Sequence, residues 1–251
     1  MPDQPRSSAA EGLDLPRILC LHGGGTNSRI FRAQCRVLHA QLKKSFRLVF
    51  ADAPWISKPG PDVESVYADW GPFRSWLAHF GQLQLTAAER QAINVSLSDA
   101  LYEDNRLGAT GMVIGLLGFS QGARIAASLL LDQQIQKGQK GISITGIDCR
   151  FAILLAGRGP LLSLDCGLVN QPPLVLPTVH VHGLQDPGLE IHRELFLRHC
   201  KAGSRFLVEW DGAHRVPIRS QDVAAVVAKL AIVAALTGIS VDRLMTGDKK
   251  A

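Results

Sequence analysis

The sequence lacks the hallmarks of several protein classes. Its five cysteines are odd in number and include no C-x-x-C pair, which argues against a disulfide framework or a zinc ribbon and for a reducing compartment such as the cytoplasm. No cationic-then-apolar leader opens the chain. The most apolar stretch, 223–239, is interrupted by Lys229, so it predicts a helix packed on the domain rather than a membrane span.

Concentrated charge is also missing. The formal net charge is +5, but lysine and arginine are scattered, with no basic run longer than a pair before the C-terminal tail. Nucleic-acid binding is therefore not predicted. A mildly basic surface is compatible with an acidic protein partner, although net charge alone does not identify one.

What the sequence does contain is ordinary globular material, 251 residues long, 46% hydrophobic and 20% charged, which can bury a sizeable core. Six short apolar runs predict buried strands, and helical patterns lie between several of them. Such alternation indicates an α/β fold with a mostly parallel sheet of about six strands and helices on both faces. The predicted strands are 17–22, 46–52, 112–118, 150–157, 178–183 and 204–210, and the predicted helices are 29–43, 86–102, 121–136 and 219–236.

No repeat, low-complexity block or long linker divides the chain. We therefore predict one domain over residues 15–245, with a disordered N-terminal tail at 1–14 and a short C-terminal tail at 246–251.

Residues 53–85 break the alternation and carry three of the four tryptophans; we call them the aromatic segment. They are interpreted as a lid or pocket wall, the alternative being a satellite core beneath a long connection. Trp76 and Phe80 share a helical spacing that suits a core face. Trp55 and Trp70 lie in looser sequence beside Pro54 and Gly71 and are the candidates for substrate contact.

One serine occupies an unusual position. In GLLGFSQGAR (115–124), Ser120 lies between Gly118 and Gly122, after an apolar run and before a helical pattern. A tight turn would explain the glycines. The strand–turn–helix context favours a nucleophile elbow, in which the flanking positions must lack bulk so that strand and helix can approach.

The first predicted strand ends in LHGGGTNS (21–28). A phosphate-binding loop would need a G-K-[ST] ending, which is absent. The better interpretation is half of an oxyanion hole, with the backbone N–H of Gly24 or Gly25 as one donor and that of Gln121, directly after the serine, as the other. His22 is expected to order this loop.

A serine nucleophile needs a base and an orienting carboxylate. His214 follows the last predicted strand through a turn, where the base belongs in the order Ser…Asp…His. Asp186 lies just past the strand 178–183 and is favoured as the acid over Asp211, which shares the turn of His214 and more typically shapes it.

The remaining histidines are given other places. His180 and His182 lie two apart on one strand face, but no third metal ligand stands nearby, so they are interpreted as core residues. The others lie in helical or irregular segments away from strand ends and are not predicted to take part; they are His39, His79, His192 and His199.

Several separated motifs together resemble the fungal family of serine hydrolases, a branch of the α/β-hydrolase superfamily. They run from about Arg17 to about Val226 and include LCLHGGGTNSRIFRAQCRVL, FRLVFADAPW, GLLGFSQGARIAASLL, LPTVHVHGLQDPG and GAHRVP. The forms HGGGTNSRIFRAQ and DVESVYADWGPFRSWL look most like members found beside fungal polyketide synthases, which are trans-acting thioesterases.

The resemblance implies a triad of Ser120, Asp186 and His214, and hydrolysis of an acyl chain from the acyl carrier domain of a polyketide synthase. No metal or organic cofactor is expected. The alternative enzyme is a carboxylesterase acting on small oxygen esters. A catalytically silent α/β-hydrolase used for binding is the alternative from another class, but its usual sign, loss of a triad member, is absent.

Overall fold

The computed structural model describes residues 12–61, 63–79, 81–138, 147–162 and 171–239. Most of the predicted tails, 1–11 and 246–251, lies outside these ranges. Residues 12–14 form a turn against the domain, because the Leu13 carbonyl accepts a hydrogen bond from the Thr110 amide at 2.8 Å.

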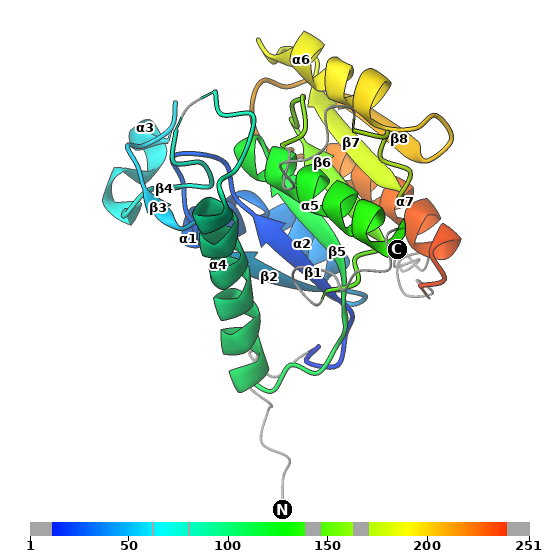
Figure 1. Cartoon of the computed structure of the whole chain (residues 1–251), viewed down its shortest axis with the longest axis horizontal. Helices are drawn as coiled ribbons and strands as arrows, with labels where there is room; N and C mark the ends of the chain where they lie inside the picture. Colours follow the sequence, from blue (N-terminus) through cyan, green and yellow to red (C-terminus); the bar gives the residue numbers. More distant parts are fainter. Residues whose placement is uncertain (1–11, 62, 80, 139–146, 163–170, 240–251) are drawn as a thin grey trace, which may run out of the picture.

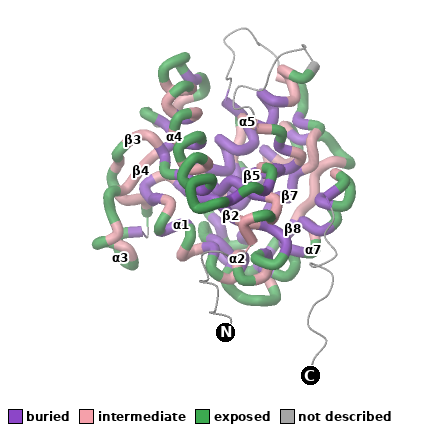
Figure 2. The backbone as a smooth tube through the Cα atoms, turned by 90° about the horizontal axis from the view of Figure 1, so that it is seen from below, coloured by how far each residue is buried: buried purple, intermediate pink, exposed green. Residues whose placement is uncertain are grey.

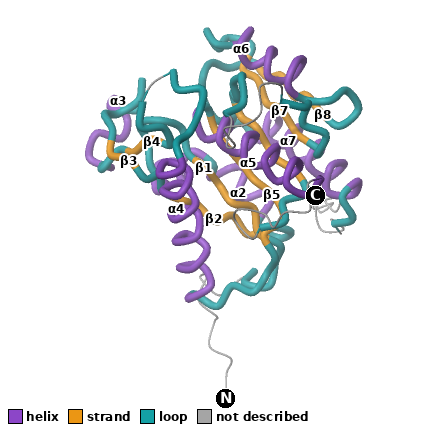
Figure 3. Tube along the Cα trace, in the orientation of Figure 1, coloured by secondary structure: helices purple, strands orange, loops and turns teal. Residues whose placement is uncertain are grey.

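A six-stranded parallel sheet forms the centre of the molecule, and it confirms the predicted fold class (Figure 3). All six predicted strands are present, within two residues of the predicted ends. In spatial order they are β2 (Arg47–Ala51), β1 (Arg17–Leu21), β5 (Val113–Phe119), β6 (Phe151–Leu155), β7 (Thr178–Gly183) and β8 (Arg205–Trp210).

Helices cover both faces of this sheet (Figure 1). On one face, α4 (Ala87–Arg106) packs on β2 and α5 (Gln121–Gly138) packs on β5 and β6. On the other lie α1 (Ser28–Gln34), α2 (Arg36–Leu42) and α7 (Ser220–Leu236). Each layer buries its own apolar cluster, so β1, β5, β6 and β7 are buried almost throughout, whereas the edge strand β8 is partly exposed; Figure 2 colours the middle of the molecule mainly as buried.

The predicted helices are confirmed with one difference. The expected helix 29–43 is two helices that meet at Cys35, whose backbone leaves helical geometry at ψ 8°. The start of α4 follows from a capping box, since the Thr86 hydroxyl accepts from the Glu89 amide while the Glu89 carboxylate accepts from the Thr86 amide. Among the described helices, α7 included, none is long and apolar enough to cross a membrane.

The strand order fixes where a site can form. From β1 the chain places β2 on one side and β5 on the other, and Leu21 at the end of β1 is paired with Gly118 near the end of β5. In open parallel sheets, ligands bind at such a switch point, outside the carboxyl ends of the strands. The loops after β1 and β5 therefore open side by side, which brings residues 22–28 next to Ser120.

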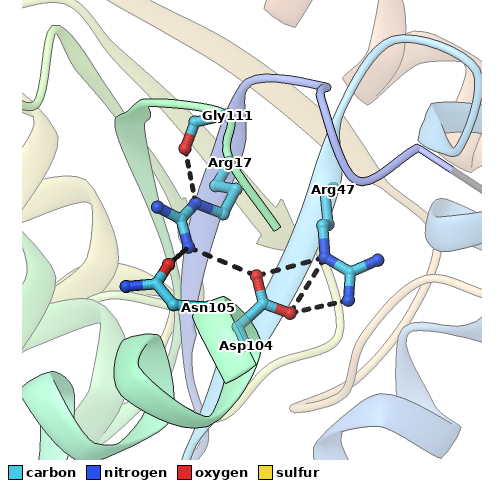
Figure 4. A network of polar contacts seen from close by, with 5 residues as sticks. All are labelled: Arg17, Arg47, Asp104, Asn105 and Gly111. Carbon is cyan, nitrogen blue, oxygen red and sulfur yellow. Dashed lines mark hydrogen bonds and ion pairs between the residues drawn. The ribbon is translucent and has the colours of Figure 1, made fainter. Parts of the chain in front are cut away.

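A buried acid fastens the last turn of α4 to the amino ends of β1 and β2, away from this switch point (Figure 4). Asp104, whose side chain is 9% exposed, accepts from Arg47 at 2.7 and 2.9 Å and from Arg17 at 3.4 Å. Arg17 also donates to Asn105 and to the Gly111 carbonyl, each at 2.6 Å. One carboxylate thus serves as the counter-charge for two arginines from neighbouring strands.

Removing this carboxylate is expected to destabilise the fold strongly. Asp104→Ala should lower the free energy of unfolding by about 3–5 kcal/mol, because two largely buried guanidinium groups lose their counter-charge. Urea denaturation measures the loss. Glu103→Ala is the matched control: its partner is the exposed Arg106, so the change should stay within about 1 kcal/mol. Equal losses in the two variants would contradict a special role for Asp104.

Candidate active site

Ser120 sits on the tight turn between β5 and α5. Its φ is +53°, in the left-handed region that non-glycine residues rarely occupy. The turn is held by the Ser120 amide, which donates to the Leu155 carbonyl at 2.8 Å, and by the Ser120 carbonyl, which accepts from the amides of Ala123 and Arg124. This is the strained strand–turn–helix joint that the sequence predicted.

The two flanking glycines are required by close packing. A Cβ added to Gly118 would lie 2.4 Å from the Ala123 Cα, and one added to Gly122 would lie 2.2 Å from the Leu21 carbonyl oxygen. Both distances are far below van der Waals contact. The glycines therefore let α5 approach β5 and β1, which explains the G-x-S-x-G spacing.

A continuous hydrogen-bond chain runs from the serine to a buried carboxylate. His214 Nε2 lies 3.0 Å from Ser120 Oγ, and His214 Nδ1 lies 2.7 Å from Asp186 Oδ2. The Asp186 side chain is 2% exposed, whereas that of His214 is 35% exposed. With Nδ1–H donated to Asp186, Nε2 is free to accept the serine proton. The structure thus brings together the three residues that the sequence singled out.

Neighbouring loops fix the acid and the histidine relative to each other. Asp186 follows β7 and His214 follows β8, and these loops are joined by the bond from the Gln185 amide to the Gly212 carbonyl at 2.9 Å. Asp211, the rival acid, is exposed and accepts a bond from the side chain of Gln185. No described contact joins Asp211 to His214, so the geometry favours Asp186.

The Asp186 carboxylate is held in its ionised form. Burial raises the pKa of Asp186, but hydrogen bonds from the Gly188 amide, His214 and His192 outweigh that effect and leave the pKa below its usual value. A carboxylate that stays charged can hold the imidazole of His214 in one tautomer.

Sequence reasoning missed His192. It lies in the short helix α6 (Leu189–Glu194), only six residues after Asp186. Its Nε2 is 2.9 Å from Asp186 Oδ2, and its side chain is fully buried. The prediction placed His192 away from the strand ends because it lies in a helix. That helix begins directly after the loop of Asp186, and this is the signal that could have found it.

Residues 22–25, which we call the oxyanion loop, lie beside the elbow. The Gly25 amide already donates to the Arg74 carbonyl at 2.9 Å. Within the described ranges no such partner binds the amides of Gly24 and Gln121. A Cβ on Gly24 would lie 3.2 Å from Gln121 Oε1, so the Gln121 side chain lies close to the Gly24 backbone.

His22 orders this loop, as predicted. Its Nδ1 donates to the Gly23 carbonyl at 2.7 Å, and its Nε2 accepts from the Ala53 amide at 3.0 Å. Burial lowers the pKa of His22 to about 4, so the ring is neutral and its bonds are structural. His22 thereby connects the oxyanion loop to the start of the aromatic segment.

The aromatic segment is fastened to both halves of the site. It contains the antiparallel pair β3 (Trp55–Ile56) and β4 (Arg74–Ser75), with α3 (Glu64–Tyr67) and a short 3-10 helix, η2 (Ala68–Trp70), between them. Trp76 is fully buried, as predicted, and its indole N–H donates to the His22 carbonyl at 2.8 Å. The Trp76 amide donates to Gln121 Oε1 at 2.7 Å.

The two tryptophans proposed to contact substrate differ in surroundings. Trp55 is half-buried and packs at the margin of the core that α4 and α5 cover. It is paired across the β3–β4 ladder with Ser75, whose hydroxyl donates to Gln121 at 3.2 Å. Trp70 packs edge-on against Tyr67, and the Arg29 guanidinium lies 4.0 Å from its ring centre. No described contact joins Trp70 to the triad. Phe80, expected to face the core, lies outside the described residues.

His180 and His182 are fully buried, as predicted, and burial lowers the pKa of each, to about 3 and about 4. They are not fully satisfied, since neither ring nitrogen of His182 has a partner. In the described ranges only Asp186, His192 and His214 gather ligand atoms as a metal would need, and the hydrogen bonds above account for that grouping.

The site combines a serine on a strained elbow with a histidine–aspartate pair on the loops beyond β7 and β8. On a six-stranded parallel sheet, this arrangement defines an α/β-hydrolase. The chain belongs to the Serine hydrolase (FSH1) family, whose sequence profile matches residues 13–226. It is therefore a serine hydrolase, and the predicted family is confirmed.

Several fungal relatives carry esterase names. A probable esterase of Aspergillus terreus is 57% identical over 228 residues, covering 86% of this chain and 88% of the relative. Esterase pigG of Monascus ruber is 49% identical over 264 residues, covering 93% and 97%. Esterase citA of Monascus ruber is 49% identical over 248 residues, covering 90% and 95%.

Solved structures share the fold at much lower identity. Arabidopsis thaliana SOBER1 aligns with a TM-score of 0.53 at 17% identity, over 87% of this chain and 98% of that one. A carboxylesterase from Mesorhizobium loti aligns with a TM-score of 0.51 at 19% identity, over 86% and 88%. These matches support the α/β-hydrolase fold.

Proposed function

We propose that this serine hydrolase is a thioesterase that releases a polyketide acyl chain from the acyl carrier domain of a polyketide synthase. Ser120 Oγ attacks the thioester carbonyl while His214 Nε2 takes its proton, and Asp186 holds the imidazole in the Nδ1–H tautomer. The tetrahedral intermediate expels the carrier thiol, which receives the proton from His214. Water, activated by the same histidine, then hydrolyses the acyl-enzyme to the free acid.

The oxyanion of each tetrahedral intermediate is assigned to two backbone donors, the amides of Gly24 and Gln121. Of the two candidate glycines, Gly25 already spends its N–H on Arg74, which leaves Gly24. Gln121 is the first residue of α5, where unpaired amides and the helix dipole favour negative charge. The Gln121 side chain lies close to the Gly24 backbone, which is consistent with the two amides facing one oxyanion.

The observation that carries the thioesterase proposal is the attachment of the aromatic segment to the site. Gln121 and His22 each bind it directly, which supports an acyl chain on Ser120 running along this segment. An aromatic side chain can cover roughly 150–250 Å², more than an acetyl group requires. We assign the wall facing the acyl chain to Trp55 and Trp70, and carrier-bound chains are the substrate class suggested by the sequence resemblance.

A carboxylesterase is the second candidate, and the esterase names of the relatives favour it. Oxygen esters and thioesters pass through the same tetrahedral intermediate, so the triad serves either substrate. The two proposals differ in how rate depends on the acyl chain and on the leaving group.

Acyl-chain length is therefore the decisive variable. For a thioesterase with an aromatic wall, kcat/KM on acyl thioesters should rise about fourfold for each methylene that becomes buried, because each contributes ~0.8 kcal/mol. Chains on an acyl carrier domain should exceed the same chains on a small free thiol. The measurement is kcat/KM along matched series of thioesters and oxygen esters from acetyl upward.

Variants of the wall test the same proposal. Trp55→Ala and Trp70→Ala should flatten the length dependence, whereas Ile56→Ala, on the same strand as Trp55 but 67% exposed, should leave it unchanged. Flat thioester rates in the wild type, together with faster oxygen esters at every length, would establish the carboxylesterase instead.

A further inference from the structure

The mechanism proposed above leaves one buried titratable group at the site unused. The His192 ring lies between the Asp186 carboxylate and the loop that follows β6, with Nε2 2.9 Å from Asp186 Oδ2 and Nδ1 2.9 Å from the Gly157 carbonyl oxygen. Both neighbours are acceptors: the neutral ring can donate to one of them, of which the charged carboxylate is the stronger acceptor, and the imidazolium can donate to both. Asp186 Oδ2 is thus shared by two imidazoles, those of His192 and His214.

We propose that His192 is a positioning residue that holds the Asp186 carboxylate in the orientation His214 needs and shares its negative charge. The proposal rests on the triad described above. It adds a histidine that touches no substrate atom and acts on the reaction only through Asp186.

Packing around the carboxylate supports this role. The Gly188 amide donates to Asp186 Oδ1 at 2.8 Å, so the two imidazoles and this amide supply three donors to two oxygens. A Cβ on Gly188 would lie 3.2 Å from His192 Nε2 and 3.3 Å from Asp186 Oδ1. The missing side chain lets the ring and the carboxylate close around residue 188.

The donor role holds in either accessible charge state of His192. The neutral Nε2–H tautomer donates to Asp186, and the imidazolium donates to both Asp186 and Gly157. Burial lowers the pKa of His192, while the hydrogen bond and charge of Asp186 oppose that lowering. The other titratable groups facing the ring are His214 on the loop after β8 and His182 on β7, both with ring centres 5.8 Å away.

Loss of this donor should have two effects on His214. The carboxylate would keep the bonds from Gly188 and His214 but lose the third donor that fixes its orientation, which slows proton transfer from Ser120. Asp186 Oδ2 would also be left to His214 alone, and any positive charge on His192 would be gone. The sole use of Oδ2 by His214 and the loss of a nearby positive charge both favour the protonated form of His214. The acid limb of the rate–pH profile should therefore move to higher pH.

The test measures the reactivity of Ser120 directly and needs no natural substrate. The rate at which a fluorophosphonate labels Ser120 is measured from acid to neutral pH in the wild type, His192→Phe and His192→Gln. Glutamine can place an amide N–H near the position of Nε2 but does not titrate. His39→Phe, at a half-buried histidine on α2, is the control, and thermal unfolding confirms that each variant is folded.

We expect His192→Phe to slow labelling roughly 10- to 100-fold, as for a lost hydrogen bond to a charged acceptor, and to shift the acid limb upward. His192→Gln should recover most of the rate and the wild-type limb, and His39→Phe should match the wild type. If phenylalanine prevents folding, His192→Leu removes the same donor with a smaller side chain.

Wild-type rate and pH dependence in the donor-less variant would overturn the proposal. So would equal slowing in the phenylalanine and glutamine variants with no shift of the limb, because that pattern indicates packing alone. A wild type that is not labelled at Ser120 would overturn the triad itself, and this inference with it. A failure of the thioesterase assignment would leave all these measurements unaffected.

Discussion

Alanine at position 120 is expected to lower ester and thioester turnover by about a millionfold, the cost of removing a triad nucleophile. The fold should persist, because alanine tolerates the turn at φ +53° about as well as serine does and the backbone bonds that hold the elbow do not use the hydroxyl. The protein should therefore unfold near its wild-type temperature while losing its reaction with a fluorophosphonate.

The matched control is Ser204→Ala. Ser204 lies just before β8 at the amino end of the sheet, opposite the edge that carries Ser120, so its loss should change neither turnover nor labelling. Mass spectrometry of the labelled wild type should find the adduct on Ser120 alone. Substantial activity in the Ser120 variant, or an adduct on another serine, would show that the nucleophile has been misassigned.

The fold was largely predictable because its strands are buried on both faces. Runs such as 150–157 are almost continuously apolar, and a parallel sheet covered by helices on both sides is the arrangement that requires this. Ser120 was predictable for a related reason. A helix can cross so closely over a strand only where glycines replace side chains, and that requirement appears in the sequence as Gly118 and Gly122.

Contacts between distant segments were not predictable in the same way. The first predicted helix breaks at Cys35, although no glycine or proline in the sequence marks a break there. The bond between His192 and Gly157 spans 35 residues. It forms because β6 and β7 are neighbouring strands, so the segments that follow them start side by side. The choice of Gly24 over Gly25 depended on the bond from Gly25 to Arg74 across 49 residues.

The second large effect concerns the acid. Asp186→Asn should lower kcat by about ten-thousandfold, because the amide reverses the tautomer of the base. The structure specifies how. The Gly188 amide donates to the Oδ1 position, so the amide oxygen of an asparagine is held there. Its NH₂ group must then occupy the Oδ2 position, where it faces His214 and His192.

An NH₂ group at that position can only donate, so Nδ1 of His214 must accept and the ring proton moves to Nε2. That nitrogen then points its proton at Ser120 Oγ and can no longer take the proton of the serine.

Asp211→Asn is the control, because the exposed carboxylate of Asp211 binds only Gln185 among the described residues. This variant should lose less than about tenfold in kcat. The comparison is made by kcat for both variants at one pH, with folding checked by circular dichroism. A large loss in the Asp211 variant and a small one in the Asp186 variant would mean that the carboxylate buried beside His214 is not the one that orients the base.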